Sequence, residues 1–331
     1  MNAPVFLRPM NNFLKIHAAS ELFAQYPSRL HLTSLPSHED EEEPSPSKAL
    51  TCYVLGYGGG LISGDVIELN IAVKENAKLI VTSQSTSKAF KAVSGRNATF
   101  VKTRAKVCKG GLLFLVPQPM QCFGNSVLTQ DTQIVMEGGI ESGKEEDDPS
   151  LLLVDWYTGG RENLDGGLWQ LDTFHTTTTV SFSHHNLFPK EEDVDDKSDE
   201  NSKASCELVF RDATRLSGGK ILRRHMRDYN IVCMVVLIGP KVKEVASTFM
   251  KQYSSRHTYD EDEAQSFGKN PSKNMDYNKG EGLNQTGEGL LVSCGTFQTG
   301  KKNRYQEGVV VRIAAATLEI AGKDVCVSRG H

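Results

Sequence analysis

Short, dense apolar runs recur along the whole chain, and glycine, proline, asparagine or aspartate residues separate them. In the clearest run, VIELNIAV, the side chains of Ile67, Leu69, Ile71 and Val73 alternate with those of a second face. This period of two is typical of a strand with one face on a core. Comparable β-branched or aromatic runs predict strands at 78–82, 98–107, 112–116, 133–136, 151–155, 169–182, 207–210, 230–238, 290–297 and 309–314.

The sequence therefore predicts a mainly β protein with a few α-helices. One helix is expected after Gly239, because Pro240 suits the first helical position. Six apolar or aromatic residues then share one helical face: Val242, Val245, Ala246, Phe249, Met250 and Tyr253. A shorter helix is expected near 317–323. No repeat of fixed period is found, so a solenoid of identical units is not predicted.

The chain of 331 residues is interpreted as a single domain, 1–331, with its core at about 26–320. Four segments are rich in acidic residues, Ser, Asn, Gly or Pro and are predicted to be disordered inserts, near 37–47, 141–150, 189–203 and 254–288. An acidic run also suggests metal binding. Carboxylates on a disordered loop must be ordered before they chelate, however, so solvated inserts are favoured.

Composition narrows the class of protein. The net charge is −4 and the basic residues are spread along the chain, so nucleic-acid binding is not expected. No apolar run of membrane-spanning length occurs and the amino terminus does not resemble a secretion signal, so the protein is expected to be cytoplasmic and without a membrane partner. The seven cysteines include no C-x-x-C pair and are interpreted as reduced, mostly buried thiols.

The glycine-rich segment GYGGGLISGD, residues 56–65, has the glycine spacing of a phosphate-binding loop between Gly59 and Gly64. Asp65 and Val66 follow where that loop requires Lys and Ser or Thr, so nucleotide binding is not expected. No G-x-S-x-G or H-E-x-x-H motif is present. The chain is therefore predicted not to be an enzyme.

Three stretches in order carry a family resemblance: GYGGGLISGD with the strand that follows it, VTSQSTSKAFKA at 81–92, and the pair LLFLVPQPMQCFGNSVLTQ at 112–130 and SLLLVDWYTGGREN at 150–163. Together they resemble the urease accessory protein UreD family, also called UreH. The chain departs from the family pattern at Ser83, where a second Thr is usual, and at Phe90, where Tyr is common. The match is poor between residues 181 and 230.

The resemblance implies a helicoidal, stacked β-sheet scaffold that is required for nickel insertion into apo-urease. It implies binding to UreF and, through UreF, to the GTPase UreG, with nickel passing through an internal channel. No tightly bound cofactor is implied, only transient nickel. Such a passage needs oxygen or nitrogen ligands that hold a divalent ion weakly.

Ten residues are candidates for channel lining or partner binding: Gly58, Gly59, Gly60, Ser63, Asp65, Gln84, Thr86, Lys88, Asp155 and Arg161. Asp65 is the first choice for a weak, transient nickel contact; alternatively its carboxylate caps the turn. Asp155 ends an apolar run, and an ion pair with Arg161 is favoured there over channel lining.

Gln84, Thr86 and Lys88 would share one face if the extended chain continued past the strand at 78–82. Such a polar row lines a wet cavity or ties down a loop. A rival hypothesis is a β-rich hydrolase or isomerase that uses Asp65 and Asp155 as an acid and base pair. It requires both carboxylates in one solvent-reached pocket.

Overall fold

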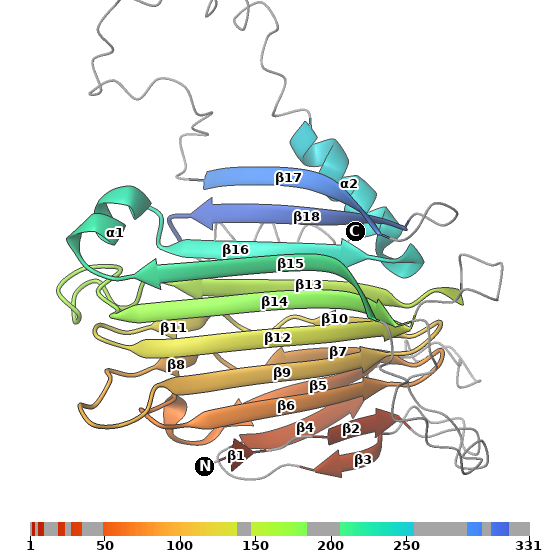
Figure 1. Ribbon diagram of the computed structural model, residues 1–331, viewed down its shortest axis with the longest axis horizontal. Coiled ribbons are helices and arrows are strands. Elements are labelled where there is room, and N and C mark those ends of the chain that lie inside the picture. Colours follow the sequence, from red (N-terminus) through yellow and green to blue (C-terminus); the bar gives the residue numbers. More distant parts are fainter. Residues whose placement is uncertain are drawn as a thin grey trace, which may run out of the picture.

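The computed structural model describes residues 2–3, 6–9, 19–23, 28–34, 49–137, 147–183, 206–254, 290–299 and 306–317. Within these ranges two stacked sheets account for most of the chain (Figure 1). Sheet A contains β1 (Asn2–Ala3), β2 (Phe6–Pro9), β3 (Ala19–Phe23), β6 (Val66–Val73), β9 (Thr99–Val107), β12 (Val127–Glu137), β14 (Thr173–Ser183) and β15 (Cys206–Ser217).

Sheet B contains β4 (Ser28–Ser34), β5 (Leu50–Gly56), β7 (Lys78–Ser83), β8 (Ser87–Ala89), β10 (Leu112–Leu115), β11 (Met120–Cys122), β13 (Ser150–Thr158), β16 (Ile231–Ile238), β17 (Leu290–Thr299) and β18 (Gln306–Ala315). The described helices are η1 (Tyr57–Gly59), α1 (Lys220–Met226), η4 (Pro240–Val242) and α2 (Lys243–Ser254). None of these helices is long and apolar enough to cross a membrane.

Between β5 and β14 the chain passes back and forth between the sheets. Sheet A has the order β15-β14-β12-β9-β6-β2-β3, and sheet B has the order β17-β18-β16-β13-β10-β7-β5-β4. Successive strands of one sheet, such as β6, β9 and β12, pair in parallel because the chain crosses to the other sheet between them. The chain therefore winds as a coil, which confirms the predicted helicoidal β architecture.

Residues of the same type come into register on successive turns of the coil, although the sequence has no strict repeat. Leu79 of β7 pairs with Leu113 of β10, which pairs with Leu151 of β13. The two steps along the sequence are unequal in length, which explains why no fixed period is detectable. These three leucines are buried in one apolar cluster between the sheets, with Ile134 and Met136 of β12. Full burial of each such side chain stabilises the fold by about 1.5–3 kcal/mol.

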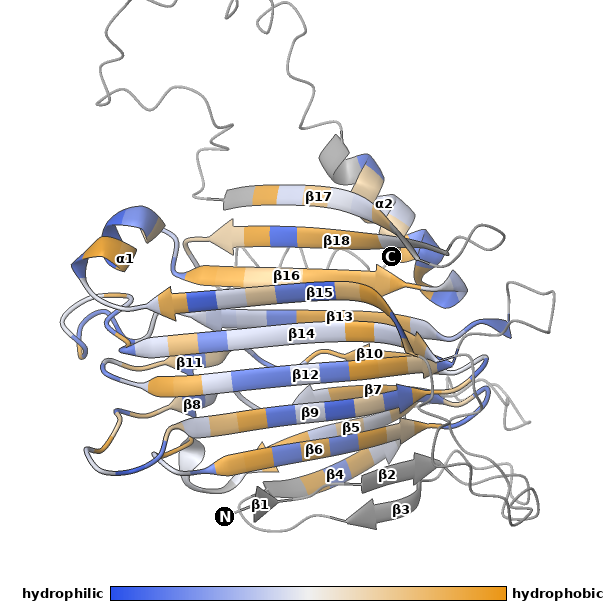
Figure 2. Ribbon diagram, viewed as in Figure 1, coloured by the Kyte–Doolittle hydropathy of each residue, from blue (hydrophilic) through white to orange (hydrophobic). Residues whose placement is uncertain are grey.

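Two further apolar clusters complete the core. One lies between the sheets at the opposite ends of the strands and contains Tyr157, Trp169 and Phe174. The other lies on the outer face of sheet B, where Val242 and Phe249 pack against β16 and β18. The chain after Gly239 thus begins with the short η4 turn and continues as α2, which confirms the predicted helix. β16 is apolar along its length, whereas the middle of β12 is hydrophilic (Figure 2).

Several boundaries differ from the predictions. The strand expected at 169–182 begins only at Thr173, because Trp169 has a φ of 61° and the chain turns there. The polar amino-terminal half of β12 and most of β15 were not predicted, since their sequences lack dense apolar runs. β5 was not predicted either, although its sequence LTCYVLG is largely apolar. Nor was α1, a basic helix without buried residues.

The predicted inserts lie largely outside the described residues. This holds for 37–47, for 189–203, for 254–288 after its first residue, and for the helix expected near 317–323 after Thr317. The predicted insert at 141–150 is described only from residue 147 onward. There Asp148 is buried and the fully buried Ser150 begins β13, so the end of that segment belongs to the sheet.

Candidate functional site

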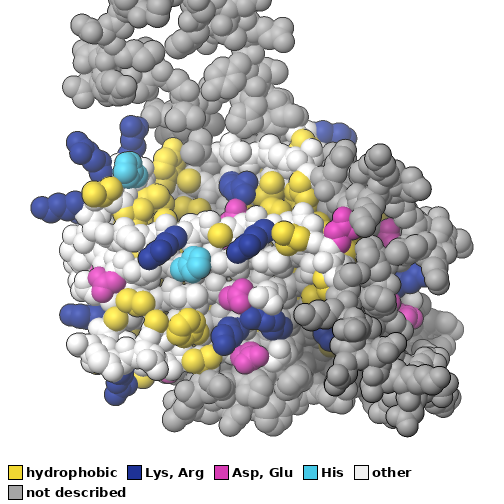
Figure 3. Space-filling model, in the orientation of Figure 1, with side chains coloured by type: hydrophobic (Ala, Val, Ile, Leu, Met, Phe, Trp, Pro, Cys, Tyr) yellow, Lys and Arg dark blue, Asp and Glu magenta, His cyan; other side chains and the backbone are white. Residues whose placement is uncertain are grey.

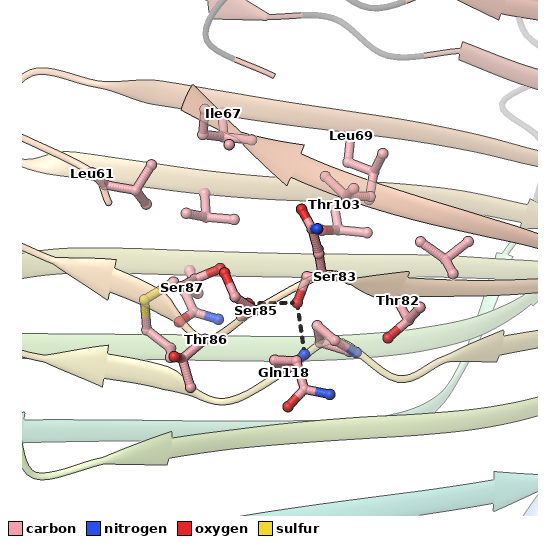
Figure 4. A pocket seen from close by; sticks show the side chains of 18 of the residues that line it. Leu61, Ile67, Leu69, Thr82, Ser83, Ser85, Thr86, Ser87, Thr103 and Gln118 are labelled. Atoms are coloured by element: carbon pink, nitrogen blue, oxygen red, sulfur yellow. Dashed lines mark hydrogen bonds between the residues drawn. The ribbon is translucent and has the colours of Figure 1, made fainter. Parts of the chain in front are cut away.

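A cavity of about 220 Å³ lies between the two sheets. Sheet A contributes Ile67, Leu69 and Thr103 to its wall, and the opposite wall includes Ser83, Ser85, Thr86 and Ser87 (Figure 4). The lining also includes Gly59 and Gln118, which are exposed, so the cavity reaches solvent on the side of the glycine-rich segment. The inner part of the cavity lies between two apolar clusters, the one that contains Leu113 and the one that contains Trp169.

Hydroxyl and amide groups dominate the polar part of the lining: Thr82, Ser83, Gln84, Ser85, Thr86, Ser87, Thr103, Gln118, Gln130 and Thr132. Ser83 fixes the wall, because its Oγ donates to the Ser85 carbonyl at 3.2 Å and accepts from the Gln118 backbone N–H at 2.8 Å (Figure 4). Gln130 Oε1 is buried and has no hydrogen-bond partner in the structure. A buried acceptor of this kind can bind a water molecule or a cation.

Asp155 places a carboxylate in the lining of this cavity, between the sheets. Its Oδ2 accepts a hydrogen bond from Thr176 Oγ1 of the opposite sheet at 3.0 Å. Burial raises the pKa of the Asp155 carboxyl, and the negative charge of Asp212 raises it further, against the opposing effect of the Thr176 hydrogen bond. Asp155 therefore holds its proton more tightly than an ordinary aspartate does.

The predicted ion pair between Asp155 and Arg161 is wrong. Gly159 and Gly160 follow the end of β13 and turn the chain away, so Arg161 pairs instead with Asp165, with Nη2 and Oδ1 2.9 Å apart. The Arg161 guanidinium also lies over the Phe123 ring, 3.8 Å from its centroid. Arg161 does not line the cavity and has a structural role in its loop.

Asp65 lines the cavity and also caps the turn before β6. Its Oδ2 accepts a hydrogen bond from the Ile62 backbone N–H at 2.9 Å, and its own N–H donates to the Ile62 carbonyl at 3.0 Å. The turn-cap interpretation of Asp65 is therefore correct. The nickel contact at Asp65 stays a prediction.

The glycine-rich segment lies at the solvent-reached side of the cavity. Gly58 and Gly59 have φ angles of 79° and 74°, in the region that favours glycine. Gly60 is required for a different reason, because a Cβ there would lie 2.4 Å from the Phe90 ring. Ser63 is buried, and its Oγ accepts from the Val93 N–H at 2.8 Å. Of these four residues, Gly59 and Gly60 contribute to the lining.

Gln84, Thr86 and Lys88 all line the cavity, but not as one extended face. The chain bends at Gln84 and Ser85, between β7 and β8, so the condition of a continued extended chain is not met there. Lys88 is held at β8, where its carbonyl accepts from the Leu61 N–H at 2.7 Å. The bend brings the intervening serines into the wall as well.

Sequence reasoning missed the sheet A side of the site. Thr103, Gln130 and Thr132 line the cavity, and Thr176 and Thr178 beside them are 3% and 2% exposed. The residues on the inner face of β14 are Phe174, Thr176, Thr178 and Val180. Two threonines at core positions of a strand were the available sequence signal for a polar interior.

Most side-chain donor atoms in this cavity are oxygens, although the lining also includes Met120 and Lys88. Among the described residues, no three His, Cys, Asp or Glu side chains are grouped closely enough to hold a metal ion. Burial raises the pKa of the Cys52, Cys108 and Cys122 thiols to about 12, so these groups are not thiolates at neutral pH. A carboxylate with hydroxyl and amide oxygens binds a hydrated divalent cation weakly.

Comparison with known proteins gives a consistent family. A family model described as UreD urease accessory protein matches residues 15–325. Urease accessory protein D of Oryza sativa subsp. indica is 25% identical over 302 residues, which cover 91% of this chain and 83% of the rice protein. The protein of the same name from Arabidopsis thaliana is 25% identical over 91% of this chain and 87% of its own length. Urease accessory protein UreD of Sorangium cellulosum is 27% identical over 61% of this chain and 54% of its own.

Proposed function

Because this chain belongs to the UreD family of urease accessory proteins, we propose that it is a non-catalytic scaffold required for nickel insertion into apo-urease. It acts in the cytoplasm, where it binds UreF and, through UreF, the GTPase UreG. The stacked sheets supply a rigid frame for these contacts. Nickel is the cargo of this assembly and is not a resident cofactor of the chain.

We propose further that nickel passes through the cavity and contacts Asp155. The observation that carries this proposal is a carboxylate held between two sheets, beside hydroxyl groups and an amide oxygen without a partner. A buried carboxylate without a cation is costly, and its raised pKa reflects that cost. A divalent cation would relieve the cost while it stays and would leave readily, because the remaining ligands are neutral oxygens.

Asp65 marks the outer end of the same path. Its carboxylate is in the lining and its side chain is partly exposed, so a cation that enters from solvent meets it before Asp155. The turn-cap hydrogen bond uses Oδ2 and leaves Oδ1 for a transient contact. One residue thus holds the turn and provides a weak ligand.

Reconstitution tests the proposed function. Apo-urease, UreF, UreG, GTP and nickel are combined with or without the purified full chain, and copurification, nickel content and urease activity are measured. We expect a complex that contains the chain and nickel-loaded urease only when the chain is present. Equal nickel loading without the chain would contradict the proposal.

The alternative function, a hydrolase or isomerase with an Asp65 and Asp155 acid and base pair, is favoured by one observation. Both carboxylates line the same cavity, and the pKa of Asp155 is raised, as a general acid requires. Its test is turnover by the purified chain alone on ester, amide and glycoside substrates. Activity that is lost in both Asp65→Asn and Asp155→Asn would support the enzyme hypothesis. Absence of turnover by the original chain would contradict it.

A further inference from the structure

A strongly basic surface lies away from the cavity, on α1 and on the outer face of β15. We call it the α1 patch, and it contains Arg211, Arg215, Lys220, Arg223, Arg224, His225 and Arg227. All seven side chains are exposed. Lys and Arg side chains gather over α1 and β15 on the face shown in Figure 3. The strand and the helix are consecutive in the chain and are joined through Gly218 and Gly219.

No ion pair between described residues involves a member of the α1 patch, although the exposed Asp228 follows Arg227 in the sequence. The ion pairs between described residues use other arginines, namely Arg104, Arg161 and Arg312. Helix polarity favours basic residues in the last turn of α1, which accounts for Arg223, Arg224 and His225. It does not account for Lys220 in the first turn or for Arg211 and Arg215 on the strand. Like charges three or four positions apart on a helix, such as Lys220, Arg223 and Arg224, repel one another unless an acidic group binds them.

Exposed apolar side chains accompany the charges. Ile221 of α1 is 75% exposed, and Leu208 of β15 is 58% exposed. Leu208 pairs with Ser181 and Arg211 pairs with Thr179, at outward positions on either side of a bulge in β15. Arginine is enriched in protein-protein interfaces, whereas lysine is depleted there. The α1 patch therefore resembles a docking surface with a charged rim and an apolar anchor.

We propose that the α1 patch docks an acidic protein segment, whose carboxylates bind the arginines and whose apolar side chain covers Ile221. The proposal rests on the proposed function, since the segment belongs to a component of urease maturation. Arginine suits this role because its planar guanidinium binds a carboxylate through two hydrogen bonds. A membrane surface is disfavoured because α1 has no long apolar face, and nucleic acid is disfavoured because the basic stripe is short.

Binding of a fluorescein-labelled poly-glutamate peptide to the purified full chain tests the proposal by anisotropy. We expect Arg223→Glu/Arg224→Glu to weaken binding about tenfold and to reduce its salt dependence. The matched control is Lys91→Glu/Arg96→Glu, which makes the same charge change in an exposed loop distant in the chain from α1. That control should leave affinity within about twofold.

A second peptide tests the apolar anchor. Ile221→Ser should weaken the binding of an acidic peptide that carries a leucine more than it weakens the binding of poly-glutamate. Equal weakening by the two charge-reversal pairs, or tighter binding to phosphatidylserine vesicles or duplex DNA than to poly-glutamate, would overturn the proposal. So would unchanged binding in Arg223→Glu/Arg224→Glu. If that variant also activates urease normally, the proposed function stands and only the docking surface is lost.

Discussion

Thr176 Oγ1 donates a hydrogen bond to Asp155 Oδ2 at 3.0 Å, across the space between sheet A and sheet B. The bond joins β14 to β13 in the polar layer that separates two apolar clusters. Asp155 is thus held by the Thr176 hydroxyl group and is also part of the cavity lining.

Asp155→Asn should raise the melting temperature at pH 7.5. The pKa of Asp155 is raised in the folded protein, so folded chains bind the proton more tightly than unfolded chains do. Stability from this group is therefore complete at low pH and falls as pH rises above the ordinary aspartate pKa. The increase in melting temperature that Asp155→Asn causes should become smaller toward pH 4. A gain that is constant with pH, measured by thermal melts, would contradict this account.

Thr176→Val should destabilise the fold by about 1–3 kcal/mol, since a hydrogen bond to a buried carboxylate is lost while the side-chain volume is kept. The pKa of Asp155 should then rise further, because the hydrogen bond opposes the effect of burial. Thr176→Ser keeps the hydroxyl group and serves as the control. Urea unfolding measures the stabilities, and the carboxyl NMR signal of Asp155 measures the pKa.

Asp65 has a turn-cap role in the structure and a proposed role in nickel transfer, and different substitutions separate the two. Asp65→Ala removes the acceptor for the Ile62 N–H and should cost about 1 kcal/mol. Asp65→Asn keeps an acceptor oxygen and should be nearly as stable as the original chain, yet it removes the negative charge. If the charge guides nickel, Asp65→Asn lowers nickel loading of urease at normal stability. Normal loading would leave Asp65 only its turn-cap role.

Gly60→Ala should destabilise the chain by about 1–3 kcal/mol, because the added Cβ would lie 2.4 Å from the Phe90 ring and 2.8 Å from the Lys88 carbonyl oxygen. Gly56→Ala is the matched control. Its Cβ would meet no atom within 4 Å and its φ is −101°, so its unfolding free energy should change by less than about 0.5 kcal/mol. Comparable losses of unfolding free energy in both variants would show that contact with Phe90 is not the reason for a glycine at position 60.

The strands that carry the core were predictable from sequence because their inner faces are apolar. Residues 66–73 alternate as expected, and the helix after Pro240 follows its apolar face. β15 and the first half of β12 were not predictable in this way, because their central residues are polar on both faces. Pairing with neighbouring strands stabilises them, in parallel for β12 and antiparallel to β14 for β15, and this is a tertiary effect.

The site was predictable in part. Sequence placed Asp65, Gln84, Thr86, Lys88 and Asp155 among the candidates, and all five line the cavity. The partner of Asp155 was assigned by closeness in sequence to Arg161, whereas the fold supplies Thr176 from the opposite sheet. Only the winding of the coil brings β13 and β14 face to face.

Nickel bound per urease active site, measured by metal analysis after reconstitution with UreF, UreG and each chain variant, tests the central claim most directly. Asp155→Asn should form the complex normally and load much less nickel. The exposed carboxylate of Asp172 provides the matched control, and Asp172→Asn should load urease as the original chain does. Full nickel loading with Asp155→Asn would contradict the proposed route through the cavity.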